Sequence, residues 1–298
     1  MRISSEAITH SKADRLAFEQ VKAVTRKHSR TFFFATGLLP KLKRRAIRAL
    51  YAFGRRTDDL VDKKDATLED VETWREQVRK PLADQDDPML RVWVKTREVF
   101  GVDTRYEDEL IDGVAMDIDF KPYKTWDDLE GYCYRVASTV GLLSMPIIGL
   151  ADGYTLDQAA PFAITLGIAL QLTNILRDVG DDLDRSRIYF PQDDLAQFGL
   201  TLGDIENKTY DERFMALMKF EIARARELYA QALPGIAMLH PSVRPAVGAA
   251  ALVYHAILDE IEAIDYQVYD QRAFTSGFKK LRMLPGILWQ VWRIKPHA

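Results

Sequence analysis

A polar row that follows an apolar run constrains the fold of this chain more than any other feature. Residues 158–176 carry no charge, and aspartates and arginines follow directly. Read as one helix at about 100° per residue, Gln171, Asn174, Asp178 and Asp182 fall within an arc of about 80°. Carboxylates four residues apart repel, and burial increases that cost. A hard divalent cation such as Mg²⁺ removes the conflict, unless the row is only the solvated acidic end of a helix.

A second stretch, residues 51–62, repeats this arrangement. On a helix, Tyr51, Arg55, Asp58 and Asp62 share one face, and the two aspartates lie four residues apart. Each aspartate motif also has an arginine beside it, Arg55 in this helix and Arg177 in the other. If the two helices face each other, they hold Mg²⁺ between two carboxylate walls, and a bridging diphosphate completes the coordination.

Composition excludes several classes of protein. Hydrophobic residues make up 47% of the 298 positions, and the net charge of -3 without a long basic block argues against a nucleic-acid partner. The single cysteine, Cys133, cannot form an internal disulfide, so we expect a buried small residue in a reducing compartment. The N-terminus lacks the apolar stretch of a secretory signal, and we therefore expect a cytoplasmic protein.

Helical patterns run along the chain, and no period-two strand pattern, dinucleotide fingerprint or P-loop stands out. We therefore expect one all-α domain over residues 1–298, with residues 1–13 flexible. The uncharged run 158–176 is long enough to span a membrane, but the polar Gln171 and Asn174 within it favour a buried core helix.

Three other segments allow two interpretations each. Residues 28–31, His-Ser-Arg-Thr, either bind an anion at a helix start or supply an ordinary N-cap. The small side chains of residues 136–149 either line a tunnel or let helices pack closely. The amphipathic basic tail, residues 278–298 with Trp289 and Trp292, either lies on a membrane surface or docks on the core.

The segment 105–119 is rich in carboxylates, including Glu107, Asp112 and Asp117. Most of these side chains alternate around a helix instead of sharing one face. We therefore expect a solvated surface here, not a third metal site.

Four segments resemble the squalene/phytoene synthase family, the head-to-head prenyl transferases. They are residues 28–32, 51–62, 132–141 and 171–191, in the family's order. The last is the most specific, because its asparagine, arginine, aspartates and Arg-Ile-Tyr-Phe-Pro tail all match. Residues 55–62, Arg-Arg-Thr-Asp-Asp-Leu-Val-Asp, look most like bacterial phytoene synthases. The resemblance implies an isoprenoid-synthase-type helical bundle with a central active-site cavity.

The resemblance also implies roles for individual residues. The expected metal ligands are Asp58, Asp62, Asn174, Asp178 and Asp182. The expected substrate-binding residues are His28, Ser29, Arg30, Thr31, Tyr51, Arg55, Gln171, Arg177, Tyr189 and Tyr254. The four aspartates and Tyr132 form the expected catalytic set, with Tyr132 relaying protons to released diphosphate. Gly180 is shared with the family, and it permits either a close approach or local unwinding of the second motif.

The implied reaction condenses two geranylgeranyl diphosphates to phytoene through a cyclopropylcarbinyl diphosphate. Mg²⁺ is the expected cofactor, with Mn²⁺ as a substitute, and NADPH is not expected to be required. The alternative within the family is the same chemistry on farnesyl diphosphate, giving squalene or dehydrosqualene. The alternative from another class is a non-catalytic helical assembly factor, although such relatives tend to lose the aspartates. The expected partners are prenyl diphosphates and, through the tail, the inner face of the membrane.

Overall fold

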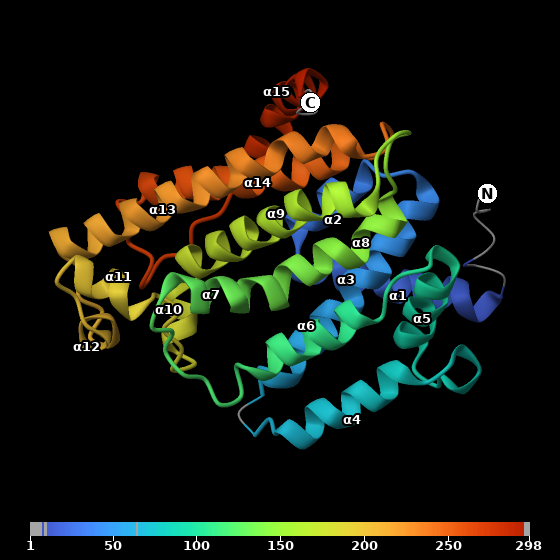
Figure 1. Ribbon diagram of the computed structural model, residues 1–298, viewed down its shortest axis with the longest axis horizontal. Helices are drawn as coiled ribbons and strands as arrows, with labels where there is room; N and C mark the ends of the chain where they lie inside the picture. Colours follow the sequence, from blue (N-terminus) through green and yellow to red (C-terminus); the bar gives the residue numbers. More distant parts are fainter. Residues whose placement is uncertain (1–7, 9–10, 64, 295–298) are drawn as a thin grey trace.

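The computed structural model describes residues 8, 11–63 and 65–294, and within these ranges every regular element is a helix and no β-strand is present. The expected all-α fold is confirmed. Long helices lie side by side along the molecule, with α13, α14 and α9 above α7 and α8, and with α6 and α4 at the opposite side (Figure 1). The elements are α1 Lys12–His28, α2 Arg30–Gly37, α3 Lys41–Val61, α4 Leu68–Arg79, η1 Leu82–Asp84, α5 Pro88–Phe100, α6 Arg105–Ala115, α7 Trp126–Cys133, η2 Tyr134–Ser138, α8 Thr139–Ile148, α9 Leu156–Arg177, α10 Val179–Leu183, α11 Gln192–Gln197, α12 Leu202–Glu206, α13 Glu212–Ala232, η3 Leu233–Met238, α14 Arg244–Ala263 and α15 Gly277–Arg293.

Capping boxes determine where several helices begin. At α4 the Thr67 hydroxyl accepts a hydrogen bond from the Asp70 amide at 3.2 Å, and the Asp70 carboxylate accepts one from the Thr67 amide at 2.9 Å. Ser11, Thr125 and Thr155 begin α1, α7 and α9 in the same way. Each box satisfies backbone N–H groups that a helix start would otherwise leave unpaired.

Part of the N-terminal segment that we expected to be flexible lies within the described residues. Ser11 caps α1, Lys12 and Ala13 belong to its first turn, and Ile8 is fully buried. The rest of the segment that we expected to be flexible, residues 1–7 and 9–10, lies outside the described residues.

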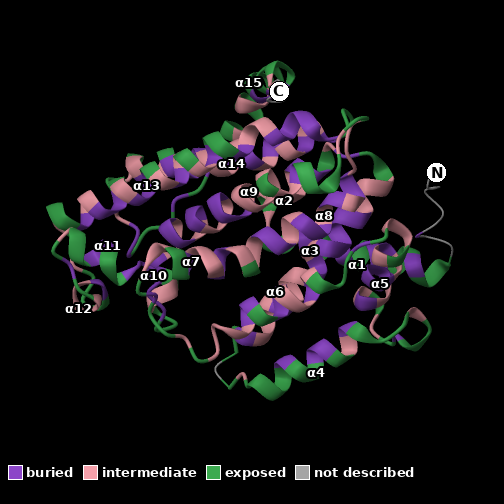
Figure 2. Cartoon of the chain, viewed as in Figure 1, coloured by how far each residue is buried: buried purple, intermediate pink, exposed green. Residues whose placement is uncertain are grey.

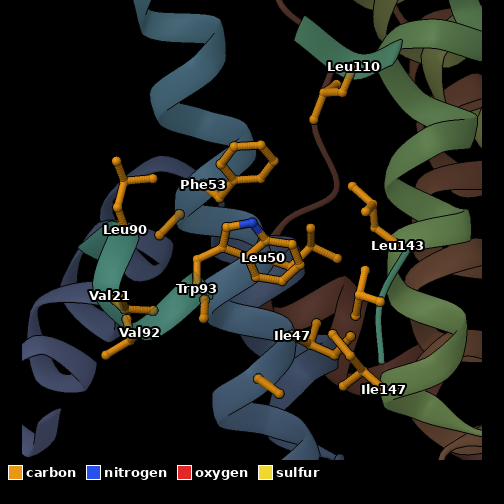
Figure 3. Close-up of a cluster of buried hydrophobic side chains, with 14 of the residues drawn as sticks. Val21, Ile47, Leu50, Phe53, Leu90, Val92, Trp93, Leu110, Leu143 and Ile147 are labelled. Atoms are coloured by element: carbon orange, nitrogen blue, oxygen red, sulfur yellow. The ribbon is translucent and has the colours of Figure 1, made fainter. Parts of the chain in front are cut away.

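One half of the core is built around a stack of aromatic rings. Phe53 of α3 stacks on Trp93 of α5, with ring centroids 5.4 Å apart. Figure 3 shows Leu90 on one side of this stack and Leu143 and Ile147 of α8 on the other. A second buried cluster joins α9, α13 and α14, and Figure 2 shows the buried residues along the facing sides of these helices. Burying large side chains on both sides of α3 and α9 holds these two helices in place.

Helix α9 lies at the centre of the bundle. Among the described helices it alone is long and apolar enough to cross a membrane. In this fold it packs against α8, α13 and α14, as expected for a core helix. Gly167 allows the closest approach, because a Cβ there would lie 2.5 Å from Ser138 Cα of η2. The small residues Gly167 of α9 and Ser138 of η2 therefore let α9 pack closely against the continuous helix formed by α7, η2 and α8.

The second aspartate motif is not one continuous helix, which corrects our expectation. Asp178 has φ -106° and ψ 18°, so α9 ends at Arg177 and α10 begins at Val179. Helical hydrogen bonds still cross the kink, from the Asp178 amide to Asn174 O and from the Asp182 amide to Asp178 O. The cause is Gly180, whose amide leaves the helical ladder to donate to Val268 O at 3.2 Å. The close approach that Gly180 was expected to permit is therefore present.

Candidate active site

The two aspartate motifs face each other, as the sequence predicts. Arg185 Nε lies 4.0 Å from Asp62 Oδ1 of α3, and Arg185 Nη1 lies 3.9 Å from Asp182 Oδ1 of α10. One guanidinium group therefore spans both motifs. Among the described residues, no three His, Cys, Asp or Glu side chains converge closely enough to hold a metal ion. A cation between the motifs therefore needs further oxygen ligands, and Mg²⁺ usually takes these from water and substrate phosphates.

The carboxylates of this site are electrostatically crowded. Burial raises the pKa of Asp58 to about 7, and Asp62 adds to the rise while Arg55 opposes it. Burial also raises the pKa of Asp182 to about 7, with a further contribution from Asp178. Two carboxyl groups that ionise with difficulty on their own become better partners for a cation, because a positive charge compensates both burial and repulsion.

Asp178 differs from these two because it already has partners. Arg177 Nε donates to Asp178 Oδ1 at 2.7 Å, and Arg272 donates to both carboxylate oxygens at 2.7 and 3.0 Å. Burial opposes ionisation of Asp178, but the two guanidinium groups lower its pKa below the ordinary value. Asp178 is therefore a carboxylate in the folded protein, held beside two cations that also suit diphosphate oxygens.

Two buried polar atoms support a site for a cation and an anion. Asn174 Oδ1 and Arg55 Nε are buried and find no hydrogen-bond partner among the described residues, while the Asn174 amide nitrogen donates to Gln171 at 3.3 Å. Buried polar atoms are normally satisfied, so each of these implies a missing partner. An oxygen acceptor suits a metal cation, and a guanidinium N–H suits a diphosphate oxygen. The residues present therefore fit Mg²⁺ together with a diphosphate.

Asp117 is a site residue that the sequence interpretation placed wrongly on a solvated surface. Its side chain is only 9% exposed. Tyr132 donates to Asp117 Oδ2 at 3.0 Å, Tyr189 donates to Asp117 Oδ1 at 2.9 Å, and the two tyrosine hydroxyls lie 3.2 Å apart. Arg187 Nη1 lies 3.6 Å from Asp117 and 4.0 Å from Asp62. This network connects the predicted residues Tyr132 and Tyr189 to the first aspartate motif.

Glu107 is the second exception in the acidic segment. Its side chain is 3% exposed, Arg97 Nη1 lies 2.6 Å from its carboxylate, and Trp93 also donates to it. Glu107 therefore contributes to the core instead of facing solvent. Asp112, whose side chain is 58% exposed, matches the expected surface.

The segment His28–Thr31 links α1 to α2. The Ser29 hydroxyl accepts a hydrogen bond from the Phe32 amide at 3.2 Å, so Ser29 acts as the N-cap of α2. The Thr31 hydroxyl accepts a hydrogen bond from Lys280 of α15 at 2.6 Å. His28 and Arg30 are exposed. The N-cap interpretation is therefore correct for Ser29, and the role of this segment in binding diphosphate stays a prediction.

Tyr51 and Tyr254 lie between the motifs and the apolar interior. Burial raises the pKa of Tyr51 to about 12, and Tyr254 on α14 adds to the rise. Tyr254 is also close to Arg177. Burial opposes the charged form of Arg177, but Asp178 and Tyr254 favour it, and the net effect is to raise the pKa of Arg177. Phe32 stacks on Tyr51 with ring centroids 4.9 Å apart. These contacts place Tyr51 beside Arg55 and Asp58 of the first motif, and Tyr254 beside Arg177 of the second.

An apolar cavity of about 1200 Å³, including its open mouth, continues inward from Tyr51. Residues from α2, α3, η2, α8, α9, α13, η3 and α14 line it, and of the described lining residues only Thr36, Tyr51 and Ser144 have polar side chains. Residues 137–148 contribute six of the lining positions, which favours the tunnel interpretation of this segment. The cavity reaches Ala159, about 22 Å along α9 from Asn174.

Comparison with known proteins identifies the family. The family model for squalene/phytoene synthase matches residues 25–279. The chain belongs to the squalene/phytoene synthase family. A phytoene synthase from Arthrospira platensis is 43% identical over 282 residues, which cover 90% of this chain and 91% of the relative. A 15-cis-phytoene synthase from Synechocystis sp. is 41% identical over 289 residues, which cover 92% of this chain and 84% of the relative.

A solved structure of similar fold is a dehydrosqualene synthase in complex with a ligand. It aligns with a TM-score of 0.86 and 30% sequence identity, covering 93% of this chain and 97% of that one. Membership of the squalene/phytoene synthase family makes this protein a prenyl transferase. The resemblance inferred from four short segments is thus confirmed over most of the chain.

The sequence interpretation missed four members of the site: Asp117, Arg185, Arg187 and Arg272. Arg185 and Arg187 lie within the matching segment 171–191, so their positions were a usable signal. Asp117 follows the end of α6, where a helical face no longer predicts direction. Arg272 lies in a non-helical segment 94 residues after Asp178, and no local pattern marks it.

Proposed function

We propose that this protein is a phytoene synthase, which condenses two geranylgeranyl diphosphates head to head through a cyclopropylcarbinyl diphosphate. One observation carries the proposal: two facing aspartate motifs lie at the ends of the same helices, α3 and α9, whose residues Tyr51 and Leu170 line a large apolar cavity. This combination suits a molecule with a diphosphate at one end and a long hydrocarbon chain at the other. The phytoene synthases with about 40% identity support the choice of substrate.

The ionisation step depends on the aspartate motifs. Asp58, Asp62, Asn174, Asp178 and Asp182 would hold Mg²⁺, which supplies positive charge for the departing diphosphate. Arg55, Arg177 and Arg272 lie beside these residues, and their N–H groups would orient the diphosphate oxygens by charge-assisted hydrogen bonds. These contacts strengthen as charge develops on the leaving group, which lowers the barrier to C–O cleavage.

The carbocation must react with carbon rather than water. The cavity beyond Tyr51 is lined almost entirely by apolar side chains, so it excludes competing nucleophiles. Two C20 chains would lie there with their double bonds near the cleaved bond. The cavity walls would thus direct the 1–1′ coupling and the later rearrangement.

Proton loss ends each half-reaction, and in this proposal Tyr132 takes part in it. Its hydroxyl donates to Asp117 and lies next to Tyr189. Burial raises the pKa of Asp117, so that this carboxylate accepts a proton more readily than an exposed one. A proton taken up at Tyr132 Oη could pass to Asp117 Oδ2 and from there to released diphosphate.

The principal alternative is the same chemistry on farnesyl diphosphate, which the structural likeness to a dehydrosqualene synthase supports. Incubation of the protein with Mg²⁺ and either diphosphate, with and without NADPH, separates the possibilities by mass spectrometry of the hydrocarbons. We expect a C40 product from geranylgeranyl diphosphate without NADPH. A C30 product only would reject the proposed substrate, and no consumption of either would favour a non-catalytic assembly factor.

The proposed setting is the cytoplasm, with peripheral contact between the tail and the inner face of the membrane. The single buried cysteine suits a reducing compartment. Phytoene is an apolar hydrocarbon and its diphosphate precursors carry long hydrocarbon chains, and a membrane would store the product and hold the chains of the substrates.

A further inference from the structure

The C-terminal helix α15 carries an exposed apolar patch that no other described element covers. Six of the ten large apolar side chains that are exposed among the described residues lie between positions 274 and 292. Trp292 is 81% exposed and Phe278 is 76% exposed. We call the set the α15 patch; it consists of Phe274, Phe278, Leu281, Leu288, Trp289 and Trp292.

The patch occupies one side of a helix whose other side is firmly docked. On α15, Phe278, Leu281, Leu288, Trp289 and Trp292 fall within an arc of about 100°. The buried residues Ile287 and Val291 lie on the other side and pack into a cluster with α14.

The docking contacts orient the patch outward. Gly248 of α14 makes room for Val291, since a Cβ there would lie 2.2 Å from Val291 Cγ2. Lys279 pairs with Glu260 at 2.7 Å, and Lys280 donates to Thr31. Figure 1 shows α15 outside α13 and α14, at the edge of the molecule.

Charge separates this helix from the rest of the protein. The chain carries a net charge of -3, yet α15 contains four cations, Lys279, Lys280, Arg282 and Arg293, and no acidic residue. Arg282 and Arg293 are exposed beside the patch, make no ion pair among the described residues, and Arg293 lies over the Trp289 ring at 4.6 Å. Exposed tryptophans flanked by cations are typical of helices that lie in the interface of an anionic membrane.

We infer that the α15 patch is a membrane-docking surface, and that its partner is a lipid bilayer containing anionic lipids. This inference rests on the peripheral contact included in the proposed function and names the surface that makes it. A second copy of the chain fits less well, because a two-fold interface through α15 would bring the cations of both copies together.

The position of α15 relates the membrane to the cavity. Val247 and Ala250 of α14 line the cavity and also contact the cluster that anchors α15. The cluster that anchors α15 therefore reaches the lining of the hydrocarbon site. A bilayer bound to the α15 patch would lie next to the part of the bundle that holds the prenyl chains.

The test is flotation of the full-length protein with vesicles of phosphatidylcholine, with and without phosphatidylglycerol. The double variant Trp289→Gln/Trp292→Gln should reduce partition onto anionic vesicles by at least about tenfold. Arg282→Gln/Arg293→Gln should remove the preference for phosphatidylglycerol. The matched control Leu68→Gln/Leu156→Gln removes two exposed leucines elsewhere and should float like the wild type.

The result that overturns the inference is equal flotation of the tryptophan variant and the wild type, or no flotation of either. Light scattering tests whether a second copy of the chain binds the patch instead. If the wild type is a dimer, the tryptophan variant is a monomer and neither binds vesicles, the patch is a dimer interface. Activity on geranylgeranyl diphosphate in detergent micelles, which the tryptophan variant should retain, separates this surface from the proposed function. Vesicle binding without turnover rejects the proposed reaction only, and turnover without vesicle binding rejects the surface only.

Discussion

Replacing Gly180 by alanine should destabilise this protein, although a glycine-to-alanine change inside a helix usually increases the stability of a protein. A Cβ at position 180 would lie 2.0 Å from Tyr269 O, 2.8 Å from Tyr269 C and 3.1 Å from Val268 O. All three are backbone atoms, so no change of rotamer relieves the contact. The segment around Val268 and Tyr269 must therefore move away from α10 by more than 1 Å, given contact distances of about 3.4 Å or more between such atoms.

The size of the effect follows from three contributions. Gly→Ala in a helix contributes about 1 kcal/mol of stability through propensity alone. Overpacking costs about 1–3 kcal/mol. Displacement also weakens the hydrogen bond from the Gly180 amide to Val268 O, which contributes about 1 kcal/mol. The net loss is about 1–3 kcal/mol, which corresponds to a fall in the thermal midpoint of about 2–5 °C for a chain of this size.

Thermal unfolding of Gly180→Ala beside Gly54→Ala tests this reasoning. Gly54 lies inside α3 with no atom within 4 Å of its Cβ position, so Gly54→Ala should raise the midpoint. Because Arg272 follows Tyr269 closely and donates to Asp178, Gly180→Ala should also lower turnover. A midpoint for Gly180→Ala at or above that of the wild type would refute the close-approach argument.

Three further predictions concern the site, the cavity and pH. Asp178→Ala should lower turnover at least about a hundredfold while the helical circular dichroism is unchanged, whereas Asp184→Ala, at an exposed position, should stay active; an active Asp178→Ala would contradict the metal assignment. Ala159→Phe should fill the far end of the cavity and lower the ratio of kcat/KM for geranylgeranyl over farnesyl diphosphate by about tenfold or more, and an unchanged ratio would place the chain end elsewhere. Burial raises the pKa of Glu221 from 4.5 to about 8. Because the folded protein holds this proton more tightly than the unfolded chain, Glu221 contributes stability that is fully present below pH 4.5. That contribution is lost as the pH rises through about 8. Glu221→Gln should therefore flatten the decline of the thermal midpoint between pH 5 and pH 8, and a parallel decline in both proteins would exclude Glu221 as its source.

Much of the candidate site was predictable because its ligands repeat along two helices. Asp58 lies in the last turn of α3 and Asp62 directly after it, while Asn174 lies in the last turn of α9 and Asp178 directly after it, at the spacing that a helical period predicts. The capping sequence at Thr67 likewise starts α4 where the local pattern indicates. These features depend on interactions within a few residues, which the order of side chains specifies directly.

The errors have a different physical origin. Asp117 lies after the last turn of α6, and its burial depends on Tyr132 and Tyr189, which are 15 and 72 residues away. The kink at Asp178 depends on Val268, in a segment that belongs to no helix. A helical pattern carries no information about either contact, because each is created by the packing of distant segments.

The sequence by itself determined the all-helical fold, the two aspartate motifs and the likeness to one family, because helical periodicity and short motifs are local properties. Only the tertiary structure decided which charges complete the site, since Arg185 spans the motifs and Arg272 reaches Asp178 from 94 residues away. It also decided that one side of α15 is docked and the other exposed. An amphipathic pattern predicts that a helix has distinct sides, but which side finds a partner depends on what the rest of the chain places beside it.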